Sequence, residues 1–461
     1  MRSVLPRKAD VMVGFVRRRR AYLWAAFFGI MSGFIFLACY TITSRHVWYE
    51  LRPQAAMVSP PALPPAEPSN KRRETPSSST SSASSICTIH QALTGLELRL
   101  SLNDSHLDRR KLYRIHENVI LAKKSIAQEH NVVCLSSIAS LSHLHWLPEL
   151  AEHWTGPASV SVFVHGHALE FVIVYISFLR SCFPTIRDNF TFHLVFPADH
   201  NESLTIVNDD LPRILQHDSD VPLFCSSYKD LSSYFTGLLK KFGDTRTMFP
   251  QNHLRNVARE GCSASQFYYM IDVDAMPQYG LYERLLEFLP RRQPCDKCLY
   301  VVPAFEGNVQ VSHPRTKKEL LARYGKKKHF RVYHVIAFWK NQGATNITRW
   351  MSLPDEEELK PAYEANFKFG YECFYVGPHT VPKYRERFIG YGFTRNVQTL
   401  ESYLAGYKFL VLNNAFMIHR GLRNRTRNEP FREKEKTHNY KTFLAFRGTL
   451  QKTYGRGKEF T

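Results

Sequence analysis

The hydrophobic pattern of residues 159–196 predicts a strand, a helix and a second strand. Valines alternate with small or polar residues over 159–164, which is strand periodicity, and a longer apolar run at 168–183 predicts a helix. A second apolar strand follows at 190–196. Because short links join the three elements, the pattern favours a βαβ unit, hence an α/β fold with a parallel sheet covered by helices. Residues 91–158 instead mix short helical patterns with polar turns, and we place no chemistry there.

A further predicted strand ends in two acidic residues. Residues 254–261 have helical spacing, residues 267–271 are aromatic and aliphatic, and Asp272 and Asp274 follow directly. Because both carboxylates stand where a strand passes into a loop, they can approach one metal ion at a position where α/β sheets bind ligands. Carboxylate oxygens suit Mn²⁺ or Mg²⁺, and such an ion can neutralise a diphosphate leaving group. Asp-x-Asp also arises by chance in solvated turns, but the strand before it favours a metal-dependent nucleotide-sugar transferase.

The first 90 residues predict a membrane anchor and a stem. Residues 21–44 are uncharged and apolar, and a helix of that length spans about 36 Å, enough for a bilayer core. Residues 1–20 are rich in arginine, and four arginines directly precede the apolar run. The positive-inside bias therefore places this tail in the cytosol and the chain after the span in a lumen. Residues 45–90 are rich in Pro and Ser and predict an extended stem before a lumenal domain at 91–461. This is the layout of a type II Golgi membrane protein, although a surface receptor would share it.

Composition and charge narrow the class of protein. With 44% hydrophobic and 13% aromatic residues, the 461-residue chain is neither wholly disordered nor fibrous. Of the net charge of +20, residues 1–20 carry +6 and residues 420–461 carry +8, which leaves the middle only mildly basic. Because a nucleic-acid-binding domain would carry its basic face on the folded body, we expect no nucleic-acid partner. The charged tail predicts a solvated face.

Cysteines and glycosylation sequons agree with a lumenal domain. One of the nine cysteines lies in the predicted span, and the eight outside it permit disulfides whose pairing the sequence leaves open. Cys295 and Cys298 have no second pair at ligand spacing, so we expect disulfide-bonded or loop cysteines rather than a zinc site. Sequons for N-glycosylation stand at Asn103, Asn189, Asn201, Asn346 and Asn424.

Several segments beyond residue 160 carry a family resemblance. They are LRNVAREG at 254–261, IDVDAMPQYGLYERLLEFL at 271–289, VVPAFE at 301–306, TNITRWMSLP at 345–354, FYVGPHTVPKYRERFIGYGFTR at 374–395 and ESYLAGYKFLVLNNAFMIHRG at 401–421. Together and in this order, they resemble glycosyltransferase family 49. The resemblance implies a GT-A type domain with a Rossmann-like mixed sheet flanked by helices, an inverting mechanism, a Mn²⁺ cofactor with Mg²⁺ as the alternative, and a UDP-sugar donor.

The resemblance also implies a substrate class. We expect transfer of glucuronate from UDP-glucuronate to a xylose-terminated O-mannosyl glycan of the dystroglycan type, in company with other Golgi transferases. Xylosyl or N-acetylglucosaminyl transfer is the alternative within the family. A glycan-binding relative without activity, or a partner of another transferase, is the alternative from another class. Loss of the acidic pair would favour an inactive relative, yet both aspartates are present.

The predicted metal ligands are Asp272, Asp274 and His419. The histidine ends an apolar run at 410–418, which predicts one strand, and the resemblance matches it to a late histidine of the family. An imidazole at a strand end can supply a nitrogen ligand to Mn²⁺. The alternative interpretation is a core or surface histidine.

Donor binding is expected on the helix before the metal strand. Arg255, Asn256 and Arg259 share one helical face there, and Asp272 follows on the strand. A guanidinium suits planar recognition of uracil, phosphate or a glucuronate carboxylate. A solvated or salt-bridged helix face would produce the same spacing.

An inverting transfer also needs a general base that takes the proton of the acceptor hydroxyl. Glu401 opens a predicted helix after the loop at 390–393, which is a plausible position at the rim of a site. Glu306 is the competing candidate, and either carboxylate could be structural. We favour Glu401 from the sequence.

Overall fold

The computed structural model describes most of the chain beyond residue 85. The predicted cytoplasmic tail (1–20), the predicted membrane span (21–44) and the predicted stem up to residue 85 lie outside the described residues. Among the residues described, no helix has both the length and the apolar character needed to cross a bilayer. The structure describes residues 86–88, 96–101, 103–124, 132–165, 168–198, 222–241, 248–326, 329–422 and 430–455.

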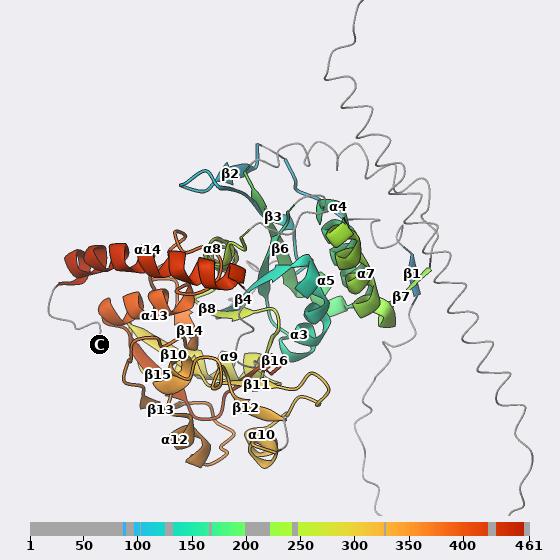
Figure 1. The fold of residues 1–461 in the computed structure, drawn as a ribbon. Helices are drawn as coiled ribbons and strands as arrows, with labels where there is room; N and C mark the ends of the chain where they lie inside the picture. The colour runs from blue at the N-terminus through green and yellow to red at the C-terminus, as the bar shows by residue number, and fades with distance from the viewer. Residues whose placement is uncertain are drawn as a thin grey trace, which may run out of the picture. The chain divides into compact units, whose positions relative to one another are not determined.

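A ten-stranded mixed sheet forms the centre of the described domain (Figure 1). Its strands follow one another in the order β13 (Pro361–Glu364), β15 (Lys408–Leu412), β10 (Cys298–Val302), β14 (Phe374–Pro378), β8 (Phe267–Asp272), β4 (Val133–Ser140), β5 (Ala158–Phe163), β6 (Phe190–Pro197), β3 (Tyr113–Ile120) and β2 (Ser105–Leu107). Strands β8, β4, β5 and β6 are parallel, whereas β14 and β3 are antiparallel to their neighbours β8 and β6. The predicted βαβ unit is confirmed, because β5 and β6 are parallel neighbours.

A four-stranded sheet continues from the large one. Its order is β12 (Phe330–Val332), β11 (Ala304–Gly307), β16 (Met417–Arg420) and β9 (Ala275–Pro277). Short connections lead from β8 into β9, from β10 into β11 and from β15 into β16. The carboxyl ends of three strands of the large sheet therefore lead directly into the small sheet, and the predicted metal residues lie at this junction.

Helices flank the large sheet and complete the predicted mixed α/β architecture. They are α3 (Leu147–His153), α4 (Leu169–Cys182), α5 (Pro184–Asn189), α7 (Tyr228–Lys241), α8 (Gln251–Glu260), α9 (Leu281–Arg291), α10 (Lys317–Arg323), α11 (Lys340–Gly343), α12 (Ile347–Ser352), α13 (Arg395–Leu404) and α14 (Pro430–Tyr454), with 3-10 helices η1 (Leu141–Trp146) and η3 (Cys225–Ser227). Helix α8 packs across β4 and β5, where Leu254 and Val257 join an apolar cluster with Ile138 and Phe163. Burial of this apolar face is what holds the predicted helix 254–261 against the sheet.

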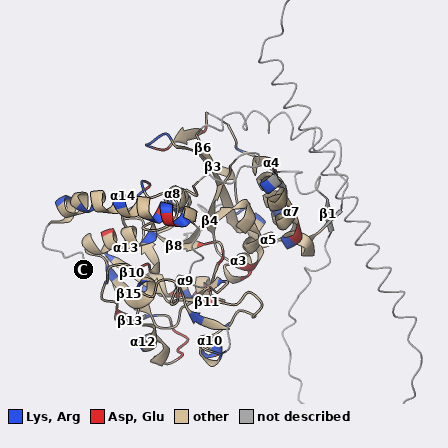
Figure 2. Ribbon diagram, viewed as in Figure 1, with Lys and Arg blue, Asp and Glu red and all other residues tan. Residues whose placement is uncertain are grey.

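The charged C-terminal tail forms the long helix α14. Phe443, Phe446 and Leu450 are buried against α13, and most of the remaining positions are exposed. Basic residues recur along its ribbon in Figure 2. The predicted solvated face is therefore the outer side of a helix whose apolar stripe packs on the domain.

One prediction about local structure is incomplete and another is wrong. Residues 91–158 hold the expected short helices at 141–153, but they also hold strands β2, β3 and β4, two of them eight residues long, which the sequence did not suggest. The predicted single strand at 410–418 is two strands in different sheets, β15 and β16. Asn413 and Asn414 separate them, because their buried side chains bind backbone groups of residues 356–360 instead of a neighbouring strand.

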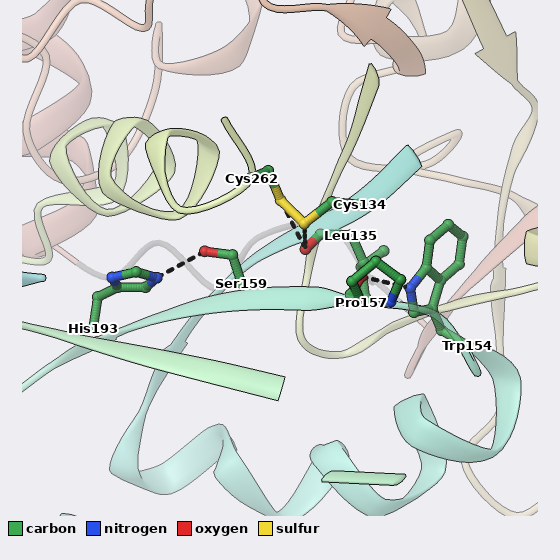
Figure 3. Close-up of a disulfide and its surroundings, with 7 residues drawn as sticks. All are labelled: Cys134, Leu135, Trp154, Pro157, Ser159, His193 and Cys262. Atoms are coloured by element: carbon green, nitrogen blue, oxygen red, sulfur yellow. Dashed lines mark hydrogen bonds between the residues drawn. A yellow bond between two sulfur atoms is a disulfide. The ribbon is translucent and has the colours of Figure 1, made fainter. Parts of the chain in front are cut away.

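Three disulfides lie within the described part of the chain, and one of them anchors α8. Cys134 of β4 is bonded to Cys262, which follows the last turn of α8 (Figure 3). The other bridges are Cys182–Cys225 and Cys295–Cys298. The expectation that Cys295 and Cys298 are disulfide-bonded or loop cysteines rather than zinc ligands is confirmed, and the structure supplies the pairing that the sequence left open. A further strand pair joins β1 (Ile86–Thr88), within the predicted stem, to β7 (Pro222–Phe224).

Candidate active site

The acidic pair lies where the large sheet passes into the small one. Asp272 is the last residue of β8, and Asp274 lies in the turn before β9. His419 of β16 stands opposite Ala275 of β9, so strand pairing brings it beside the turn. Its Nε2 lies 3.2 Å from Oδ2 of Asp274, and the backbone of Arg420 donates to the carbonyl of Asp274. The structure thus brings Asp274 and His419 together from positions 145 residues apart in the sequence.

Two arginines hold Asp272. Its Oδ1 lies 3.0 Å from a terminal nitrogen of Arg395 and 3.4 Å from one of Arg255. Burial acts to raise the pKa of Asp272, but these guanidiniums outweigh it and hold the pKa below its ordinary value. Asp274 and His419 also interact electrostatically with this carboxylate. Asp272 is therefore ionised and fixed, with 31% of its side chain exposed.

A further carboxylate, that of Glu372, belongs to the same charge network. Burial raises its pKa, while Arg395 and Arg255 act to lower it. The side-chain amide of Asn341 in α11 donates to its Oε2 at 2.5 Å. Arg395 and Glu372 are the site residues that sequence reasoning did not single out. Arg395 is the last residue of the segment 374–395, which carries the family resemblance. Glu372 lies two residues before the start of that segment, and no motif in the sequence points to it.

Glu306 lies next to His419 in the small sheet. The two residues are register partners on β11 and β16, which are parallel, so their side chains leave the sheet on the same face. The carboxylate of Glu306 is fully buried, binds the Nε of Arg331 and accepts from the backbone of His334 at 3.2 Å. The ring of Tyr333 packs 5.2 Å from that of His419. Glu306 is therefore adjacent to the predicted metal ligands.

Glu401 lies elsewhere, inside the packing of α13 on α14. Its fully buried carboxylate binds the guanidinium of Arg385 and accepts from the hydroxyl of Tyr454 at 3.1 Å. Helix α13 begins at Arg395, so Glu401 does not open the helix at an exposed rim as expected. Its role as general base stays a prediction that this location does not favour.

The predicted donor-binding helix contacts both the acidic pair and the loop after β14. Arg255 binds the carboxylate of Asp272. Asn256 instead pairs with the backbone of Tyr384, and Arg259 donates to the carbonyls of residues 379, 381 and 382. All three side chains are buried rather than solvated. Asn256 and Arg259 therefore hold the loop after β14, and Arg255 is the one that faces the acidic pair.

The predicted glycosylation sites differ in their surroundings. Asn103 is exposed in a turn, and Asn346 is exposed at the start of α12, where its side chain caps the helix. Asn189 is half-buried and donates to the carbonyl of Thr155. The sequons at 201 and 424 lie outside the described residues.

The large mixed sheet with an acidic pair at a central strand end fits a GT-A-like glycosyltransferase domain. Residues 132–455 match the family described as glycosyl-transferase for dystroglycan, and the chain belongs to this family, glycosyltransferase family 49. The matched residues include eight of the ten strands of the large sheet (all but β2 and β3), the small sheet, the acidic pair and α14. The family resemblance drawn from the sequence is thereby confirmed.

Named relatives give the same class of enzyme. The chain is 32% identical to beta-1,4-glucuronyltransferase 1 of Bos taurus over 371 residues, covering 76% of this chain and 81% of that protein. It is 32% identical to the Homo sapiens protein of the same name over 358 residues, with the same coverage. It is 26% identical to xylosyl- and glucuronyltransferase LARGE2 of Mus musculus over 341 residues, 72% of this chain and 40% of that one. The protein is an enzyme, a glycosyltransferase.

Proposed function

We propose that this enzyme transfers glucuronate from UDP-glucuronate to a xylose-terminated glycan, with inversion and with Mn²⁺ as its cofactor. The observation that carries the proposal is the convergence of Asp274 and His419 at 3.2 Å beside the arginine-held Asp272. Carboxylate oxygens and an imidazole nitrogen fit Mn²⁺, with Mg²⁺ as the weaker alternative because it prefers oxygen ligands. The names of the relatives support glucuronate as the sugar.

Different residues of the site would bind the metal ion and orient the carboxylate of Asp272. Asp274 and His419 would hold the metal ion, and a bound Mn²⁺ would supply positive charge to the diphosphate leaving group. Arg255 and Arg395 fix the carboxylate of Asp272, so its orientation costs no rearrangement when the donor binds. Their charge also makes this strand end attractive to an anionic donor.

The general base is one of the carboxylates near the acidic pair. Glu306 is the better placed of the two predicted candidates, because it is the strand neighbour of His419. Glu372 is a third candidate, since burial raises its pKa and it interacts with Asp272. A raised pKa suits proton abstraction near neutral pH.

The acceptor would lie along the segment 333–341, which links the two sides of the site. It begins at Tyr333 against His419 and ends at Asn341, which binds Glu372. Between them Phe338 and Trp339 are exposed, the latter by 64%. Exposed aromatic rings at a polar site suit stacking on the apolar faces of sugar rings.

The cellular context belongs to the same proposal. The arginine-flanked apolar run at 21–44 supports a single-pass type II anchor, with the catalytic domain in the Golgi lumen. The described disulfides support an oxidising compartment. Glycans on the exposed Asn103 and Asn346 would agree with this topology, and digestion with an N-glycosidase that leaves the mass unchanged would oppose it.

The experiment that tests the function is transfer with a panel of UDP-sugars. The purified protein, Mn²⁺ and a xylose-terminated oligosaccharide should release UDP and form product with UDP-glucuronate, and chelation should stop the reaction until Mn²⁺ is restored. Asp274→Asn should abolish it, while Glu260→Gln, a change at a half-buried position of α8 that pairs with Lys383, should not. Preference for UDP-xylose or UDP-N-acetylglucosamine would contradict UDP-glucuronate as the donor. Full activity in excess chelator would contradict the proposed dependence on Mn²⁺.

A further inference from the structure

A second acidic and histidine cluster lies away from the acidic pair of β8. Asp108 follows β2, His253 lies in the first turn of α8, and Glu386 belongs to the loop between β14 and α13. One ligand atom from each residue lies within 4.8 Å of the other two. Three segments that are distant in the sequence therefore present a nitrogen and two carboxylate oxygens to a single point.

His253 is fully buried, and its ring makes no hydrogen bond of good geometry with the described residues, although its Nε2 faces the carboxylates of Asp108 and Glu386. Its side chain is 0% exposed, and neither ring nitrogen has a hydrogen-bond partner among the described residues. Its ring packs against that of Tyr113 at 4.7 Å, which fixes its orientation. An unsatisfied buried imidazole is costly, so a ligand for its nitrogen would remove a real penalty.

The distances fit coordination better than hydrogen bonding. Nε2 of His253 lies 3.5 Å from Oδ2 of Asp108 and 3.8 Å from Oε2 of Glu386. Both separations exceed the roughly 2.7–3.2 Å of a nitrogen–oxygen hydrogen bond. They are close to the distance of about 3.4 Å between two ligands that each lie about 2.1 Å from a tetrahedral zinc ion.

The two carboxylates are already oriented by other groups. Asp108 accepts from the backbone nitrogens of residues 110, 112 and 113, which builds the turn between β2 and β3 around it. Glu386 accepts at its other oxygen from the side-chain amide of Asn256, at 2.9 Å. Such supporting hydrogen bonds are what orients the ligands of a metal site.

We propose that Asp108, His253 and Glu386 bind a zinc ion, with a water molecule in the fourth position beside the partly exposed Glu386. An imidazole with two carboxylates and one water matches four-coordinate zinc. Calcium would need six or more oxygen ligands, and Mn²⁺ binds mixed nitrogen and oxygen sites more weakly than zinc.

The ion would tie together the elements that hold Asp272. His253 and Arg255 are two residues apart on α8, and Glu386 lies in the loop that leads to Arg395. Both arginines that bind Asp272 are therefore carried by segments that the zinc site would fix. The site is a positioning device for the acidic pair and takes no part in the transfer itself.

The test is the zinc content and melting temperature of the full chain, carried out in a His419→Ala background so that zinc bound at the active site does not contribute. This parent, loaded with zinc and then desalted, should retain about one zinc per chain by mass spectrometry. Adding Glu386→Gln should weaken zinc binding by about tenfold or more. Adding Glu260→Gln instead should not, although this matched acid on α8 also contacts the loop, through Lys383.

The melting temperature separates the ion from a folding defect. Chelation should lower it by roughly 3 °C or more in the parent and in the Glu260→Gln variant, and should leave the Glu386→Gln variant unchanged. A parent that retains no zinc overturns the proposal, and so does equal zinc binding by the Glu386→Gln variant. Because the readout is metal content rather than transfer, failure here leaves the proposed function untouched.

Discussion

At the scale of the residue, the pair formed by Asp274 and His419 decides whether a metal ion can hold the donor. If His419 supplies a nitrogen ligand, His419→Ala should weaken Mn²⁺ binding and UDP binding together, each by at least about tenfold, since the diphosphate would be held through the ion. Calorimetric titration of Mn²⁺, and of UDP at fixed Mn²⁺, measures the two affinities. His438→Ala, a change at an exposed position of α14, is the control. Unchanged UDP affinity in His419→Ala would remove this histidine from the ligand set.

Substitution of the two predicted general bases, Glu306 and Glu401, should affect different properties of the enzyme. Glu306→Gln should lower kcat by about 10²-fold or more, the usual scale for a lost general base, with little change in UDP affinity. Glu401→Gln removes the charge that Arg385 binds, so it should lower the free energy of unfolding by about 1–3 kcal/mol and leave kcat near normal. Initial rates at saturating donor and urea unfolding curves distinguish the two. Normal turnover in Glu306→Gln would transfer the role to Glu372.

A local pattern revealed the acidic pair and the family resemblance supplied His419, but the sequence did not indicate the partners that tertiary packing alone brings in. Asp272 and Asp274 are visible because a strand pattern precedes them and their spacing is short. Arg395 is 123 residues from Asp272, and only the packing of α13 makes it a partner. Glu401 looked exposed after a glycine-rich loop, yet α14 covers it, which no local pattern could indicate.

At the scale of the element, the segment 333–341 is where acceptor specificity should lie. Trp339→Ala should raise the KM for the xylose-terminated acceptor by about tenfold, which corresponds to about 1.4 kcal/mol of lost stacking, and should leave the KM for the donor unchanged. Leu444→Ala, at an exposed apolar position of α14, is the matched control. An equal rise in both KM values would indicate distortion of the site rather than loss of an acceptor contact.

Helices and strands with a clear hydrophobic periodicity were predicted correctly, but the break between two consecutive strands was not. The βαβ unit of β5, α4 and β6 and the helix α8 follow the hydrophobic pattern closely. The break at Asn413 was missed although two consecutive asparagines interrupt the run at 410–418. Asparagine alone does not end a strand, and the cause here is a set of hydrogen bonds to residues 358 and 360, which no local pattern shows. Strand β4 was missed since its serines are buried in the sheet, where polarity suggested a turn.

At the scale of the whole molecule, burial of histidines should make stability depend on pH. His116, His153 and His193 each have a pKa lowered to about 4, in each case chiefly because burial disfavours the charged ring. His193 shows why protonation is incompatible with the fold. Its Nδ1 accepts from the backbone of Asn118 at 2.9 Å, and its Nε2 points to the hydroxyl of Ser159 (Figure 3).

The sign of the effect follows from proton binding. Between pH 6.5 and about 4 the unfolded chain takes up a proton at each of these histidines and the folded chain does not, so stability falls as the pH falls through this window. Each histidine contributes a slope of up to about 1.4 kcal/mol per pH unit. His193→Asn keeps an acceptor for the backbone of Asn118 and should reduce the slope by that amount, whereas His438→Asn, at an exposed position, should not. Urea unfolding between pH 4.5 and 6 measures the difference, and equal slopes in His193→Asn and the unmodified protein would show that His193 is already charged in the fold.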